Sequence, residues 1–266
     1  MTATEYPKFQ LRLPMSPSRL NSWEACPKKV YYEGLGYPTV ETDSRAAQMG
    51  TLVHDVVGEF FMNISDLPEN DEIEGLALDI FDEKWRSSPV RGFEDKATTC
   101  VDNFIRKEKE RRQLEEKYYK PTHIEYEFES FPFHGTIDWY NANNGIIRDW
   151  KTNADPGFSD DMLRQGMVYK NLVRNNGLKV NMVIFEMLIN GTSQVMPLKD
   201  NKWLKDQLVN MRNDIQKGLF IKKPKMKKNR YFCDNYCGYR VRCDQEDRDK
   251  TLGQMLYKSD FYNYRK

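Results

Sequence analysis

The sequence predicts a mixed α/β fold in which helices flank a central mixed β-sheet. Three features point to this class. Apolar residues recur at helical spacing over residues 44–119, strand-type segments separated by turn signals follow, and a further helical segment interrupts those strands. The chain shows no internal repeat and no long linker. A single domain over residues 1–266 is therefore expected.

Capping signals and periodicity place the helices of the first half. Ser16 is expected to cap a short helix that starts at Pro17. Residues 44–62 carry an apolar stripe, and on this helix His54 lies one turn after Gly50. Further helices are expected around residues 30–32, over 72–86 and over 94–119.

The second half is expected to alternate strands with helices. Residues 124–133, 136–140 and 146–152 have the composition of strands, and the last two flank a loop over residues 141–145. A helix over 159–175, a second hairpin of 180–189 with 194–198 closing at Asn190-Gly191, and a helix over 204–219 complete the expected order.

Composition and charge narrow the classes of protein to consider. Hydrophobic residues make up 39% and charged residues 30% of the 266 residues, as in a globular protein. The 41 basic and 40 acidic residues give a net charge of +1, so the whole-molecule charge indicates no partner. Apolar runs such as residues 182–185 are far too short to span a membrane, and residues 1–13 lack the apolar core of a signal peptide. We expect a soluble cytoplasmic protein that does not bind membranes.

Two carboxylates and a lysine form the first candidate site. In Asp149-Trp150-Lys151 the two charged side chains share one face, because a strand has a period of two. If the preceding loop is residues 142–145, Asp138 lies directly opposite Asp149. Facing carboxylates repel unless a cation lies between them, and hard oxygen ligands suit Mg²⁺ or Mn²⁺. The alternative is an ordinary polar hairpin on the surface.

Four spaced motifs resemble a known nuclease family. In order and spacing they are similar to the RecB-type branch of the PD-(D/E)xK nucleases, over a stretch from about Ser16 to Cys243. This resemblance implies a restriction-endonuclease-like core. The motifs are Gly50-x3-His54, Gly135-x2-Asp138, Asp149-x-Lys151 and Gln165-x3-Tyr169.

The resemblance also implies roles for these residues. His54, Asp138 and Asp149 would ligate the divalent metal, assisted by the backbone carbonyl of Trp150, and Lys151 would hold or help deprotonate the attacking water. Gln165 and Tyr169 share a helix face, where they would line the site and orient the nucleic-acid backbone, or else serve helix packing. Of Glu125 and Glu127, one is expected to face the site, and the sequence does not decide which.

Four of the five cysteines form a second candidate site. Cys26 and the run Cys233-x3-Cys237-x5-Cys243 are similar to the iron–sulfur-stapled members of the same branch, which include AddB-type nuclease domains and the CRISPR-associated exonuclease of the fourth Cas type. The resemblance implies a [4Fe–4S] cluster that ties the two ends of the chain together, with zinc as the alternative, since soft thiolates select either. Cys100 is a competing fourth ligand, but it fits the apolar stripe of a core helix.

The residues between the nuclease core and the cysteines are strongly basic. Residues 217–230 contain seven basic residues and no acidic one, which predicts a nucleic-acid-binding arm or a solvated linker. We therefore divide the chain into an N-terminal segment with the first cluster cysteine, the nuclease core, a basic arm with the cysteine cluster, and an aromatic C-terminal tail. Their expected ranges are 16–43, 44–216, 217–248 and 249–266.

The expected activity is that of a metal-dependent DNA exonuclease acting on single strands or ends. The resemblance implies 5′-to-3′ polarity, a prokaryotic or viral protein in a host cytoplasm, and a setting in recombination, repair or CRISPR spacer processing. The partners would be DNA, further copies of the chain, or proteins of recombination or CRISPR adaptation. Two alternatives are a non-catalytic iron–sulfur subunit that binds DNA ends and a zinc-stapled interaction protein that binds acidic proteins.

Overall fold

The computed structural model describes residues 15–39, 44–114, 119–153, 159–197, 202–217, 219, 233 and 237–246. The chain divides into two compact units, of which the larger contains residues 12–21 and 44–212 and the smaller contains residues 22–43 together with both ends of the chain. The helices are α1 (Pro17–Ala25), α2 (Pro27–Gly34), α3 (Arg45–Asn63), α4 (Asn70–Ser87), α5 (Glu94–Leu114), α6 (Asp160–Asn175) and α7 (Lys202–Gln216).

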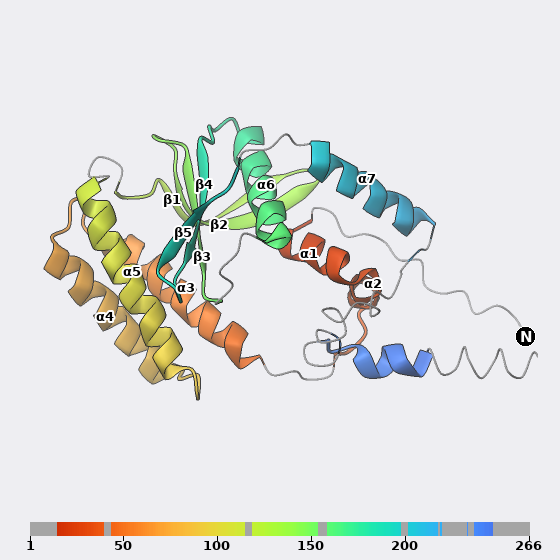
Figure 1. Cartoon of the computed structure of the whole chain (residues 1–266), viewed down its shortest axis with the longest axis horizontal. Helices are drawn as coiled ribbons and strands as arrows, with labels where there is room; N and C mark the ends of the chain where they lie inside the picture. The colour runs from red at the N-terminus through yellow and green to blue at the C-terminus, as the bar shows by residue number, and fades with distance from the viewer. Residues whose placement is uncertain are drawn as a thin grey trace, which may run out of the picture. The chain divides into compact units, whose positions relative to one another are not determined.

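A five-stranded mixed sheet forms the centre of the larger unit (Figure 1). The strands are β1 (His123–Ser130), β2 (Phe133–Asn141), β3 (Ile146–Lys151), β4 (Met182–Met187) and β5 (Thr192–Val195), and they lie side by side in chain order. All neighbours are antiparallel except β3 and β4, which are parallel and are connected through α6. A parallel pair requires such a crossover. The predicted mixed α/β class is confirmed.

The loop between β2 and β3 sets the register of the candidate site. Asn141 Oδ1 accepts hydrogen bonds from the backbone N–H groups of Asn143 and Asn144, and Gly145 takes the left-handed φ of 70° that closes the turn. Tyr140 pairs with Ile147, as the sequence predicts. Continued by two residues, this register brings Asp138 opposite Asp149.

The first hairpin differs from its prediction. The expected strand over residues 124–133 ends at Ser130, and β2 begins already at Phe133, which pairs with Ser130. Phe131 and Pro132 form the connection between the two strands. Proline has no N–H to donate to a neighbouring strand, so the break in the ladder falls there.

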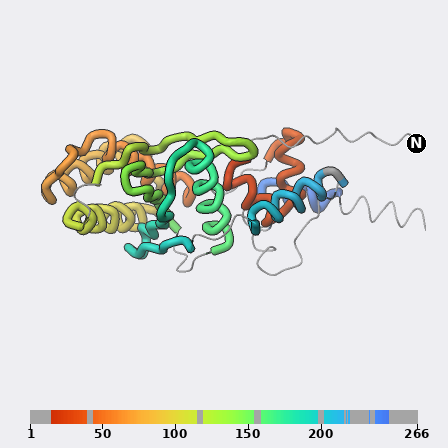
Figure 2. Tube along the Cα trace, turned by 90° about the horizontal axis from the view of Figure 1, so that it is seen from above, coloured from red at the N-terminus to blue at the C-terminus, as the bar shows by residue number. Residues whose placement is uncertain are grey.

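Helices α3, α4 and α5 pack together around the main hydrophobic core of the larger unit. Trp139 and Trp150 from the sheet join this core, and the Trp150 ring stacks on Phe61 at 5.8 Å between centroids. Helix α6 contacts β1, β2 and β4. Asp149 and Trp150 point to opposite faces of β3, so the Asp149 side chain lies on the face away from the core that holds Trp150. Figure 2 shows α3, α4 and α5 grouped apart from α6.

The smaller unit has its own aromatic cluster. Tyr32 of α2 packs against Tyr239 and Cys243, and the Arg242 guanidinium lies 3.3 Å from the centre of the Tyr37 ring. Lys28 and Glu246 add an ion pair at 3.1 Å. Segments far apart in the sequence therefore meet in this unit. Among the described helices of the whole chain, none has the length and apolar character needed to cross a membrane.

Candidate active site

Two glycines let α3 approach the sheet on either side of His54. A Cβ added to Gly50 would lie 3.0 Å from Thr152 Oγ1, just beyond β3, and one added to Gly58 would lie 3.2 Å from Cγ of Glu125 on β1. Gly50, His54 and Gly58 are spaced by four residues and so share one side of the helix. The close approach explains why a glycine precedes the histidine by one turn.

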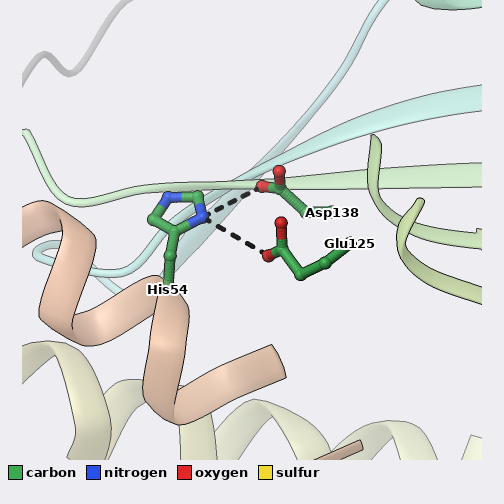
Figure 3. A group of neighbouring side chains, drawn as sticks. All are labelled: His54, Glu125 and Asp138. Carbon is green, nitrogen blue, oxygen red and sulfur yellow. Dashed lines mark ion pairs between the residues drawn. The ribbon is translucent and has the colours of Figure 1, made fainter. Parts of the chain in front are cut away.

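His54 points from α3 toward two carboxylates on the sheet (Figure 3). Its Nδ1 lies 3.5 Å from Asp138 Oδ2 and 3.9 Å from Glu125 Oε1. Burial alone would lower the pKa of His54, but Asp138, Glu125 and Asp149 raise it to about 9. Three negative groups therefore surround the imidazole.

Asp138 and Asp149 are the buried carboxylates of the site. Asp138 is 6% exposed and Asp149 is 1% exposed. The backbone N–H of Trp150 donates a hydrogen bond to Asp138 Oδ2 over 2.9 Å, so the two motif strands are joined at the carboxylate itself. Burial and the neighbouring Asp149 raise the pKa of Asp138, against the lowering effect of His54. Asp138 therefore holds a proton more readily than a free aspartate does.

Lys151, Gln165 and Tyr169 enclose Asp149. Lys151 Nζ lies 2.5 Å from Asp149 Oδ2 and donates to Gln165 Oε1 over 2.8 Å. Gln165 Nε2 and the Tyr169 hydroxyl both donate to Asp149 Oδ1, over 2.8 and 3.1 Å. Burial and the nearby carboxylates raise the Tyr169 pKa well above its usual value, so this hydroxyl stays protonated. All three predicted residues meet at one carboxylate.

Glu125 is the residue for which the sequence left a choice. Its carboxylate lies 3.9 Å from His54 with the side chain 33% exposed, whereas the Glu127 side chain is 71% exposed and lies 3.7 Å from His134 on the neighbouring strand. Glu125 has a φ of 44°, the one positive φ among the described non-glycine residues. The sequence could not have predicted this conformation, because glutamate rarely adopts a positive φ and residues 124–130 read as an ordinary strand.

The donor set of this site suits a hard divalent cation. In the described part of the chain, one group of three histidine, cysteine or acidic residues has ligand atoms all within 4.8 Å of one another, and it consists of His54, Glu125 and Asp138. Carboxylate oxygens are the ligands that Mg²⁺ and Mn²⁺ prefer, and the imidazole nitrogen adds a ligand type that transition metals accept.

The cysteines meet only in part. Cys26 lies near enough to Cys237 to raise the pKa of its thiol, after the larger effect of burial, and Cys243 packs on Tyr32. No three of the described cysteines have sulfur atoms within 4.8 Å of one another. Cys100 is fully buried in the core of the larger unit, as its apolar stripe predicts. Most of the basic segment over residues 217–230, and the aromatic tail, lie outside the described residues.

Comparison of the sequence with known protein families identifies one family. The family model of the PD-(D/E)XK nuclease superfamily matches residues 14–244, most of the chain. The chain belongs to the PD-(D/E)XK nuclease superfamily. No curated protein and no solved structure matches it significantly.

The PD-(D/E)XK nuclease superfamily takes its name from a motif of two acidic residues and a lysine. The residues of this chain that resemble that motif are Asp138, as its first acid, and Asp149 with Lys151, as its second acid and its lysine. The superfamily consists of nucleases, so a nucleic-acid substrate and a divalent metal agree with the site. The RecB-type branch is a finer assignment that rests on the spaced motifs alone.

Proposed function

We propose that this protein is a metal-dependent DNA exonuclease that hydrolyses phosphodiester bonds in single strands or at ends. The observation that carries the proposal is the convergence of Asp138, Asp149 and Lys151 beside His54. An isolated acid–lysine motif is common on protein surfaces. Here the two acids are buried, and the lysine is held by an ion pair with Asp149 and a hydrogen bond to Gln165, so the arrangement is more specific than the motif.

The metal would be held by His54, Asp138 and Asp149, with the Trp150 carbonyl as a further ligand. When bound, the cation would lower the pKa of a coordinated water and neutralise charge on the phosphoryl oxygens. Asp138 keeps its orientation through the Trp150 N–H. His54 can reach Asp138 because Gly50 lets α3 lie close to Thr152.

Lys151 and its partners would act on the attacking water. The ammonium can hold the water oxygen by hydrogen bonding and stabilise negative charge on the phosphoryl group. The water oxygen forms a bond to phosphorus, the bond from phosphorus to the leaving oxygen breaks, and a proton passes to that leaving oxygen. Gln165 accepts from Lys151 and donates to Asp149, which fixes the direction of the ammonium.

The preference for DNA ends and the 5′-to-3′ polarity rest on the resemblance to the RecB-type branch. The basic segment over residues 217–230 supports a nucleic-acid substrate, because cations along one stretch neutralise phosphates. Recombination, repair or CRISPR spacer processing is the setting that we propose. The partners would be recombination or CRISPR adaptation proteins, or further copies of the chain.

We also propose that Cys26, Cys233, Cys237 and Cys243 bind a [4Fe–4S] cluster. In its support, Cys26, Cys237 and Cys243 belong to the smaller unit, and Cys26 affects the pKa of Cys237. Tyr32, Tyr239 and Tyr37 would shield the cluster from water. Anaerobic purification followed by iron, sulfide and zinc analysis tests this. Iron and sulfide at four each per chain, lost in Cys237→Ser, support the cluster, and zinc in their place contradicts it.

Digestion of end-labelled single-stranded DNA tests the activity. The wild-type protein, Lys151→Ala and the matched variant Lys96→Ala, which removes an exposed lysine of α5, are compared in Mn²⁺ and in EDTA. We expect release of the 5′ label by wild type and Lys96→Ala in Mn²⁺ only. Release of the 3′ label first would show 3′-to-5′ polarity and contradict the proposed direction. Binding of DNA with no cleavage by any protein would instead support an end-binding subunit.

A further inference from the structure

Glu125 lies beside the metal site without a role in the proposed mechanism. Its Oε1 is 3.9 Å from His54 Nδ1, and Glu125, His54 and Asp138 have ligand atoms within 4.8 Å of one another. The carboxylate points into the site rather than away from it (Figure 3). Its nearest cationic partner is His54, which Asp138 already contacts.

The backbone of Glu125 is held in an unfavourable conformation. The pairs Ile124–Trp139 and Tyr126–Ile137 bracket Glu125 and Asp138, which are therefore cross-strand neighbours. Two carboxylates at such positions repel. The φ of 44° adds conformational strain, because the left-handed region is poorly tolerated by residues with a long side chain. Despite the repulsion and the strain, this position brings one more negatively charged oxygen to the site.

The opposite wall makes room for this side chain. Gly58, one turn after His54, would place a Cβ 3.2 Å from Glu125 Cγ if it were alanine. An alanine at this position would therefore force Glu125 or α3 to give by a few tenths of an ångström. The absence of a side chain at Gly58 therefore leaves space for the Glu125 side chain to reach the site.

We propose that Glu125 is a ligand of the divalent cation, on the side of the site where His54 lies. This inference rests on the proposed function and adds a ligand that the four spaced motifs do not contain. A charged oxygen from β1 would complement the imidazole nitrogen from α3 and the carboxylate of Asp138 from β2. Hard oxygen ligands of this kind are the ones that Mn²⁺ and Mg²⁺ prefer.

Calorimetric titration of the metal-free protein with Mn²⁺ alone, without DNA, tests the assignment. We expect Glu125→Gln to bind Mn²⁺ at least about tenfold more weakly than wild type, since even residues that only support ligands alter affinity by this much. Glu125→Asp should lose a similar factor, because it keeps the charge but shortens the reach. Glu127→Gln, which removes the same charge two residues along β1, should bind as wild type.

A second pair of variants separates the geometry from the charge. Gly58→Ala crowds the Glu125 side chain without replacing any proposed ligand and should weaken Mn²⁺ binding, whereas Gly75→Ala on α4, where an added Cβ meets nothing within 4 Å, should not. Glu125→Asn accepts the left-handed backbone more readily. We expect it to raise the midpoint of thermal unfolding while it weakens Mn²⁺ binding.

The outcomes distinguish this inference from the proposed function. Equal Mn²⁺ affinity in wild type and Glu125→Gln would overturn the assignment of Glu125, even if wild type cleaves DNA. Retained affinity in Glu125→Asp would also overturn it, because the contribution would then be long-range charge. A wild-type protein that binds no Mn²⁺ and cleaves nothing would remove the proposed function as well.

Discussion

Gln165 donates a hydrogen bond to Asp149 Oδ1 over 2.8 Å, and its other amide atom accepts from the lysine of the same motif. One side chain of α6 therefore fixes both charged groups of Asp149-Trp150-Lys151 at once. This relationship assigns the amide a positioning role within the protein. The sequence suggested contact with the nucleic-acid backbone or helix packing, and neither includes this clamp.

Removing the clamp should lower activity without unfolding the protein. Gln165→Leu leaves Lys151 and Asp149 to hold each other without the amide, and we expect kcat to fall by about tenfold or more. The pH dependence of kcat should shift too, since the lysine loses an acceptor. Asn175→Ala, at the exposed end of α6, is the control. A kcat within twofold of wild type, with an unchanged pH profile, would remove the positioning role.

The close approach at Gly50 should be sensitive to a single methyl group. Gly50→Ala places a Cβ 3.0 Å from Thr152 Oγ1, so the Thr152 side chain or α3 must give, and we expect His54 to move relative to Asp138. We expect about a tenfold loss of activity with little loss of helix content by circular dichroism. The double variant Gly50→Ala, Thr152→Ala should recover part of the activity. Full activity of the single variant would show that the contact is not needed.

The sequence predicts the secondary structure of the site and the pairing of its two motif strands, but not the tertiary contact that brings Glu125 beside His54. Apolar spacing predicts α3, and the turn at residues 141–145 predicts that Asp138 faces Asp149, because both signals are local. The left-handed backbone of Glu125 accompanies contacts with His54 and Gly58 of α3, which lie far away in the sequence. Nothing in the residues around Glu125 encodes those contacts, so the sequence could not choose between Glu125 and Glu127.

The metal-free protein should become less stable as the pH rises. The folded state holds the His54 proton to a pKa of about 9, above the usual value of 6.5, so its stabilisation is complete below 6.5 and is lost as the pH rises through 9. The raised pKa of Asp138 acts in the same direction. In EDTA we expect the free energy of unfolding in urea to fall by on the order of 1 kcal/mol over this range. His54→Gln should flatten the change, and a rise in stability would contradict the account.

Cys100 should be protected from alkylation in the native protein. It is fully buried in α5, and burial raises the pKa of its thiol to about 12, so little thiolate exists at neutral pH. Iodoacetamide labelling followed by peptide mass analysis should leave the Cys100 peptide unmodified until urea is added. Rapid native labelling of this peptide would contradict its place in the core and reopen Cys100 as a cluster ligand.

The central claim is that Asp149 supports metal-dependent phosphodiester hydrolysis. The most direct measurement is the initial rate of nucleotide release from single-stranded DNA in Mn²⁺ by wild type, by Asp149→Asn and by Asp79→Asn, an exposed residue of α4. The account predicts release by wild type and Asp79→Asn, loss of at least about a hundredfold in Asp149→Asn, and no release in EDTA. Equal rates for wild type and Asp149→Asn, or a rate unaffected by EDTA, would contradict it.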